Sequence, residues 1–289
     1  MTAPRPARAA DPEWAAVGSA LLPGVGQMVN GDFAAGGAQM GLYFVLARQY
    51  LILLDKPDYL EPKDRVDSKN FFIDINKTTF EADLYGTALT DLTFYSAFAA
   101  YRDARQAISN TGYNTPAPRE SLTDLAIAPY RWEYLQRPTT FIPLLVALYS
   151  AVSPATDDRY LYRPDRTITR NTLRNGAFVQ SEMVGVGEEA FFRGFLNNGL
   201  SDSLGENWGL ATSSLIFGLA HEGIGSQASI AQASLFGAYL GWLQQRNNYD
   251  IGEGVAIHFW WDFLVMLGML KERTNKSQEV QLLNVSLRF

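Results

Sequence analysis

Ionisable side chains are concentrated at three places in the otherwise apolar second half of the chain. In the first, within residues 187–194, Glu188 and Glu189 are adjacent and Arg193 follows four residues after the second of them. Residues four apart on a helix share a face, so Glu189 and Arg193 are expected to form an ion pair. Glu188 then points about 100° away and is free to act as a general base. A solvated charged turn is the alternative interpretation of this run on its own.

The other two places hold the two histidines of the chain. His221 closes an uncharged stretch and is followed by Glu222, but a zinc-protease motif would need a second histidine where Gly225 stands. His258 and Asp262 are four apart in an apolar run, so the carboxylate can orient the imidazole or hold it charged. Taken alone, each histidine is also compatible with a hydrogen-bonded core residue. Together with the paired glutamates, they indicate a site.

Composition excludes several other kinds of chemistry. The chain has no cysteine, which rules out disulfides, a cysteine nucleophile, zinc fingers and iron–sulfur clusters. Two histidines are too few for a three-histidine metal site. The net charge of -6 and the lack of a basic face argue against a nucleic-acid partner.

The elements that must position these residues are predicted to be helices. The mean hydropathy of -0.09 is typical of a soluble protein, but it averages over long stretches with one charge or none. A membrane-spanning helix needs about 20 mostly apolar residues. We therefore expect an all-α, multi-pass transmembrane bundle of about 6–8 membrane helices with small extramembrane segments; a soluble all-α protein is the alternative. The apolar stretches are 14–31, 33–54, 84–101, 138–156, 223–245 and 254–270.

Breaks between these stretches suggest how the chain is organised. Pro23 and Gly24 interrupt the first stretch, which we interpret as a retained membrane segment rather than a cleaved signal. Residues 71–75 alternate like a strand, and the tail 280–289 has a similar pattern that could pair with it. Composition divides the chain into two parts. These are 1–155, with membrane helices, polar loops and no assigned function, and 156–289, which holds the motifs and a C-terminal tail.

Together the motifs Glu-Glu-x-x-x-Arg, Phe-x-x-x-His and His-x-x-x-Asp resemble the signature of a protease family. This is the CAAX protease and bacteriocin-processing (CPBP, or ABI) family, which includes the type II CAAX prenyl endopeptidases. The resemblance covers about 171–271 and implies a multi-helix intramembrane endopeptidase. In this family the third motif often ends in Asn, whereas this chain has Asp262.

The resemblance also implies a separate catalytic role for each of these residues. Glu188, assisted by His221, would activate a water molecule that attacks the scissile carbonyl carbon. His258, with Asp262 beside it, would stabilise the oxyanion. This interpretation requires Glu188 and the two histidines to converge in one site.

Two residues are implied to have a supporting role, since Glu189 and Arg193 would hold the site in shape. No cofactor is required by this mechanism. The alternative is a zinc-dependent metalloprotease in which Glu188, His221 and His258 are the metal ligands.

A non-enzymatic function is the remaining alternative. Ionisable groups within a membrane also build proton relays in transporters, although no internal repeat of the kind common in transporters is visible here. A family member that serves as a scaffold is a further possibility. The expected partners are a peptide or membrane-protein substrate and membrane lipid, and the expected location is the bacterial inner (cytoplasmic) membrane.

Overall fold

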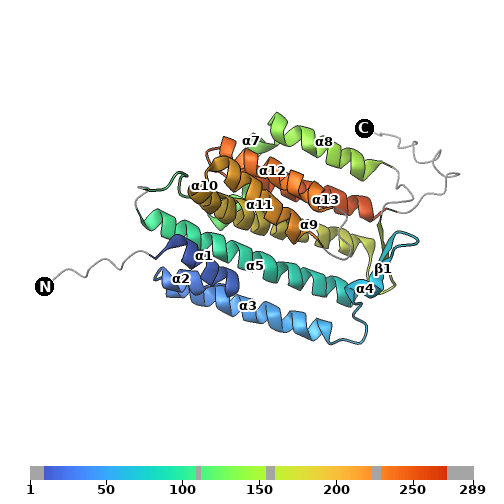
Figure 1. Ribbon diagram of the computed structural model, residues 1–289. Coiled ribbons are helices and arrows are strands. Elements are labelled where there is room, and N and C mark those ends of the chain that lie inside the picture. The colour runs from blue at the N-terminus through green and yellow to red at the C-terminus, as the bar shows by residue number, and fades with distance from the viewer. Residues whose placement is uncertain (1–9, 109–111, 154–159, 223–228, 272–289) are drawn as a thin grey trace.

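The computed structural model describes residues 10–108, 112–153, 160–222 and 229–271, and these are almost entirely helical. Long helices lie side by side, with the helices that precede α5 on one side of it and α9 to α13 on the other (Figure 1). The first helices along the chain are α1 (Pro12–Leu21), α2 (Val25–Val29), α3 (Phe33–Leu54), α4 (Pro62–Arg65) and α5 (Lys77–Ala107).

After α5 the chain forms short helices first and then longer ones. The short elements are α6 (Leu122–Ile127), the 3₁₀ turn η1 (Ala128–Tyr130) and α7 (Trp132–Leu135). They are followed by α8 (Pro138–Val152), α9 (Arg170–Glu188), the π-helical segment η2 (Glu189–Asn197), α10 (Asn198–Leu204), α11 (Glu206–Ala220), α12 (Ile230–Arg246) and α13 (Gly252–Met269).

The predicted break after the first helix is confirmed. Gly24 has a left-handed backbone (φ 95°) between α1 and α2, a conformation that glycine adopts without steric cost. A side chain there would also meet the carbonyl oxygen of Gly36 on α3. Glycine at this point therefore allows the chain to reverse and α2 to pack closely on α3.

A small sheet joins the two halves at one end of the helices (Figure 1). Its strands are β1 (Val66–Asp67), β2 (Phe72–Ile75) and β3 (Leu161–Pro164), in that order. β2 pairs with β1 antiparallel and with β3 parallel. The predicted strand is thus confirmed at β2, while the tail 280–289 that was suggested as its partner lies outside the described residues.

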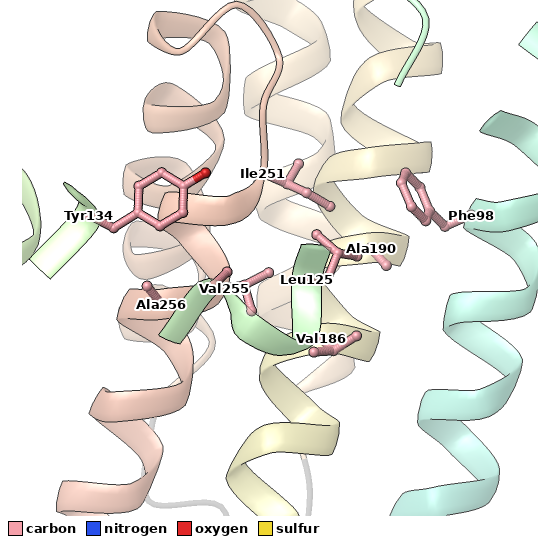
Figure 2. Close-up of a cluster of buried hydrophobic side chains, with 9 residues drawn as sticks. Phe98, Leu125, Tyr134, Val186, Ala190, Ile251, Val255 and Ala256 are labelled. Atoms are coloured by element: carbon pink, nitrogen blue, oxygen red, sulfur yellow. The ribbon is translucent and has the colours of Figure 1, made fainter. Parts of the chain in front are cut away.

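A buried apolar cluster holds α5, α6, α9 and α13 together (Figure 2). Phe98 and Leu125 are fully buried, which stabilises the fold by about 1.5–3 kcal/mol for each side chain. Val186 and Ala256, two residues before Glu188 and His258 respectively, belong to the same cluster. The packing of this core therefore sets how the motif residues face one another.

The all-α class predicted from the sequence is confirmed. Among the residues that the structure describes, no helix combines the length and the apolar character needed to cross a membrane. The transmembrane nature of the bundle stays a prediction.

Candidate active site

The three motifs converge at the centre of the second half. Glu188 is the last residue of α9, and Glu189 begins η2 without a break in the chain's helical course. His221 lies at the C-terminal end of α11, whereas His258 and Asp262 are on α13, which packs against α9. π-Helical segments are rare and frequently occur at functional sites, as η2 does here.

Glu189 is the centre of a buried polar network. Its Oε1 accepts hydrogen bonds from Arg193 Nη1 (2.9 Å) and from His258 Nδ1 (2.8 Å). Arg193 Nη2 donates a further hydrogen bond to the carbonyl oxygen of Gly237 on α12 (3.2 Å). The ion pair expected from the spacing of Glu189 and Arg193 is therefore present. The same carboxylate also orients His258, which the sequence did not indicate.

Glu188 lies between the two histidines. Its Oε2 is 3.5 Å from Nε2 of His221 and 3.8 Å from Nε2 of His258. This oxygen is buried and accepts no hydrogen bond from the described part of the chain. Asp262 lies beside the pair, with its Oδ2 3.6 Å from His258 Nε2. The structure thus brings all four residues together.

The hydrogen bonds of His221 locate a proton in the site. Its Nδ1 is 2.8 Å from the carbonyl oxygen of Phe217, which can only accept, so Nδ1 carries a hydrogen. In the neutral imidazole, Nε2 then has a lone pair facing the Glu188 carboxylate, which also only accepts when ionised. Nε2 of His221 is therefore the ring nitrogen that is directed at Glu188, at 3.5 Å from its Oε2.

His258 is surrounded by acceptors on both sides. Nδ1 faces Glu189, and Nε2 faces both Glu188 and Asp262. With carboxylates at both ring nitrogens, the ring presents a hydrogen-bond donor to the acceptors on each side only when both nitrogens carry hydrogen. The side chain is only 3% exposed, so bulk water contributes little to this balance. The geometry therefore agrees with an imidazolium at this position.

Phe217, the first residue of the second motif, packs against both halves of the site. Its ring centroid is 4.2 Å from the guanidinium carbon of Arg193 and 4.2 Å from the ring centroid of His221. The first contact is a cation–π interaction in a buried place, where it is stronger than at a surface. The aromatic residue of this motif thus holds the arginine and the histidine in a fixed relation.

Asp91 lies against Gly187 beside this site and belongs to none of the three motifs. It lies on α5, is 7% exposed and has its Oδ2 without a hydrogen-bond partner in the described residues. Glu188, His258 and Asp262 lie near enough for their charges to act on its ionisation. The available signal was that Asp91 is the single charged residue in the stretch 84–101.

The described residues contain no group of three or more His, Cys, Asp and Glu side chains arranged for a metal ion. For a zinc alternative, the donor types are nevertheless suitable. The Nδ1 atoms of His221 and His258 are bound to Phe217 and Glu189, which leaves both Nε2 atoms directed at Glu188. The arrangement of the outer hydrogen bonds is the one that metal-binding histidines use.

Comparison with known families agrees with the motifs. Residues 175–264 match the family model described as type II CAAX prenyl endopeptidase Rce1-like. The matched segment contains all three motifs, from Glu188 to Asp262, and it confirms the resemblance to this protease family. No curated protein and no solved structure matches the chain.

Proposed function

We propose that this chain, whose residues 175–264 carry the type II CAAX prenyl endopeptidase family match, hydrolyses peptide bonds with a water molecule activated by Glu188. The observation that carries the proposal is the position of Glu188 Oε2 between the Nε2 atoms of His221 and His258. A carboxylate that faces two imidazoles in a buried place is suited to take a proton from water and to pass it on. The separations of 3.5 and 3.8 Å are of the kind that shorten when substrate is bound.

In the proposed reaction, Glu188 removes a proton from water while the water oxygen bonds to the scissile carbonyl carbon. The carbonyl π electrons move to its oxygen, and the N–H of His258 donates a hydrogen bond to this oxyanion. The oxyanion then re-forms the carbonyl, the C–N bond breaks and the amine leaves with the proton that Glu188 and His221 hold. The products are a carboxylic acid and an amine, and the side chains return to their starting states.

The buried network supplies the rigidity that this mechanism needs. A hydrogen-bond donor stabilises an oxyanion best when it is already oriented before the reaction. Glu189 fixes the imidazole of His258 through Nδ1, and Arg193 fixes Glu189. Supporting residues of this kind hold the reacting groups within the tolerance that catalysis requires.

The site is proposed to operate in a membrane. Large apolar side chains are exposed along whole faces of α3 and α8, and such patches are typical of contact with lipid or a partner. The bacterial inner (cytoplasmic) membrane is the proposed location. On α8 the exposed side chains are Phe141, Ile142, Leu145, Val146, Leu148, Tyr149 and Val152.

The proposed substrate is a peptide or a membrane protein. The name of the matched family specifies prenylated CAAX sequences, so a farnesylated peptide ending in Cys-a-a-X is the first probe. The same peptide without the farnesyl group and unfolded casein are the second and third. Cleavage of the first alone would point to prenyl recognition, whereas cleavage of all three would point to a broad endopeptidase.

The experiment uses the full chain in phosphatidylcholine vesicles and compares Glu188→Gln with Glu182→Gln. Glu182 is on the same helix, and its carboxylate accepts a hydrogen bond from Tyr130 (2.8 Å), which a glutamine can also accept. We expect Glu188→Gln to abolish cleavage and Glu182→Gln to retain it. Equal cleavage by both variants would contradict the proposal. Proton uptake by the vesicles without cleavage of any probe would support the transporter alternative instead.

A further inference from the structure

We propose that Asp91 is a catalytic residue contributed by the N-terminal half, the second acceptor for the water molecule that Glu188 activates. The inference rests on the proposed function. Asp91 lies on α5, outside the residues that match the family model, and none of the three motifs includes it. Four observations on its surroundings carry the inference.

The first observation is that Asp91 lacks the partners that the fold provides for its structural acids. Leaving a buried carboxylate oxygen without a donor is costly, because it loses its hydration and gains nothing in return. Glu253, which is 1% exposed, shows the usual solution. It accepts hydrogen bonds from the side chains of Arg137, Thr139, Thr140 and Asn247. Asp91 Oδ2 accepts none from the described residues.

The second observation is the close approach of α5 to α9 at this point. A Cβ atom on Gly187 would lie 2.5 Å from Oδ1 of Asp91 and 2.8 Å from its Cα. Only glycine therefore permits the backbone of α9 to approach Asp91 in this way. Since Gly187 directly precedes Glu188, this approach places Asp91 against the residue before the proposed general base.

The third observation is that the unpartnered acids gather in one place. Among the buried side-chain atoms of the described residues that have no hydrogen-bond partner, the carboxylate oxygens are those of Asp91, Glu188 and Glu189. All of them belong to this site. A group of acceptors without donors is a binding place for a molecule that donates hydrogen bonds, and a water molecule has two O–H groups to donate.

The fourth observation is the electrostatic coupling of Asp91 to the reacting groups. Glu188, His258 and Asp262 lie near enough for their charges to act on the ionisation of Asp91, and no arginine or lysine satisfies its Oδ2 among the described residues. Asp91 is therefore coupled to the site rather than to a separate ion pair.

These observations give Asp91 a defined step in the reaction. The attacking water donates one O–H to Glu188 and the other to Asp91, which leaves a lone pair directed at the carbonyl carbon. The first proton is transferred to Glu188 as the C–O bond forms. The second stays on the new hydroxyl group, which remains hydrogen-bonded to Asp91 until the C–N bond breaks. Orientation of a reactant by two fixed groups lowers the barrier by reducing the entropy lost on reaction.

The test compares Asp91→Asn with Asp103→Asn in the full chain, in the same vesicles and with the probe that the wild type cleaves. Asp103 is on the same helix, is 41% exposed and pairs with its neighbour Arg102. We expect Asp91→Asn to lower kcat on the order of 100-fold with KM within about twofold of the wild type. Its thermal unfolding temperature should be unchanged or higher, because asparagine has the same shape and cannot carry a buried charge. Asp103→Asn should retain wild-type kcat.

A second variant keeps the inference testable if Asp91→Asn does not fold. Asp91→Ala leaves a space for a small carboxylate, so added formate should restore part of kcat, whereas equal chloride should not. Wild-type kcat in Asp91→Asn, or an unfolding temperature that falls with the loss of activity and no rescue by formate, would overturn the inference. In either case the inactivity of Glu188→Gln would leave the proposed function standing. If the wild type cleaves none of the three probes, the proposed function itself fails.

Discussion

Replacing Glu189 with glutamine should both destabilise the fold and abolish activity. Glu189 is fully buried, and its Oε1 accepts hydrogen bonds from the side chains of Arg193 and His258. A hydrogen bond to a charged group contributes about 1.5–3 kcal/mol. In Glu189→Gln the guanidinium of Arg193, 3% exposed, would remain buried without a counter-charge. Breaking one partner of a buried ion pair costs about 3–5 kcal/mol, and we expect the unfolding free energy to fall by this amount.

A second substitution separates the cost of the buried charge from the loss of catalysis. Arg193→Gln alone should also destabilise, because it leaves the Glu189 carboxylate with His258 as its remaining charged partner. In the double variant both charges of the ion pair are gone, so its loss of stability should be smaller than the sum of the two single losses. Activity should not return, since His258 has lost the carboxylate that orients it. The double-mutant cycle should therefore show a coupling of about 1–3 kcal/mol between the two residues.

The assay is chemical unfolding followed by circular dichroism for the wild type, the two single variants and the double variant. Cleavage of the peptide probe is measured in parallel. The reasoning would be refuted by a Glu189→Gln variant within about 1 kcal/mol of the wild type, which is far below the cost of an uncompensated buried charge. Additive effects of the two substitutions would likewise show that the residues do not act as a pair.

Three further predictions concern packing, pH and metal. Gly187→Ala should lower the unfolding free energy by about 1–3 kcal/mol, because its Cβ would overlap Asp91. Gly37→Ala, in open space on α3, should raise the unfolding free energy by about 0.5–1 kcal/mol. Changes of the same sign in the two variants would contradict this packing. Burial raises the pKa of Glu120 above its ordinary 4.5, so the folded state binds this proton more tightly than the unfolded state does. The unfolding free energy should therefore fall as pH rises from 4.5 toward the raised pKa. In urea titrations Glu120→Gln should lessen this dependence of the unfolding free energy on pH, and an unchanged dependence would contradict the assignment. Cleavage should survive exhaustive chelation, and a loss that added zinc reverses would favour the metalloprotease alternative.

Local features of the fold could be predicted from the sequence. The stretch 33–54 is a single helix, α3, with these limits, because Asp32 caps its first turn and Asp55 follows its last apolar residue. Pro23 and Gly24 ended the first helix, and the alternation at 71–75 gave strand β2. In each case the deciding interactions are between residues close in the chain, and a pattern of residue types records them.

Pairing between distant segments could not be predicted in the same way. β2 takes β3 as its parallel partner, although Phe72 and Leu161 are 89 residues apart. Strands this short have little pattern of their own, so their partners depend on where the neighbouring helices place them. The π-helical course of η2 is also absent from the sequence pattern, which fits an ordinary helix equally well.

The same distinction between contacts close in the chain and contacts between distant segments applies to the candidate site. Sequence spacing was sufficient to pair Glu189 with Arg193 and His258 with Asp262, because each pair lies four residues apart on one helical segment. Two further features depend on the packing of α9, α11 and α13. The carboxylate of Glu189 also binds His258, and Glu188 lies between two imidazoles.

Asp91 shows this limit most clearly. As one charge in an apolar stretch, it was visible in the sequence, but nothing local related it to Glu188 almost a hundred residues later. Its place in the site results from the contact of α5 with α9 at Gly187, where the absence of a side chain lets the two backbones meet. The sequence by itself determined which residues have the chemistry for a site. Only the tertiary structure, through close packing of helices from both halves, decided which of them share it.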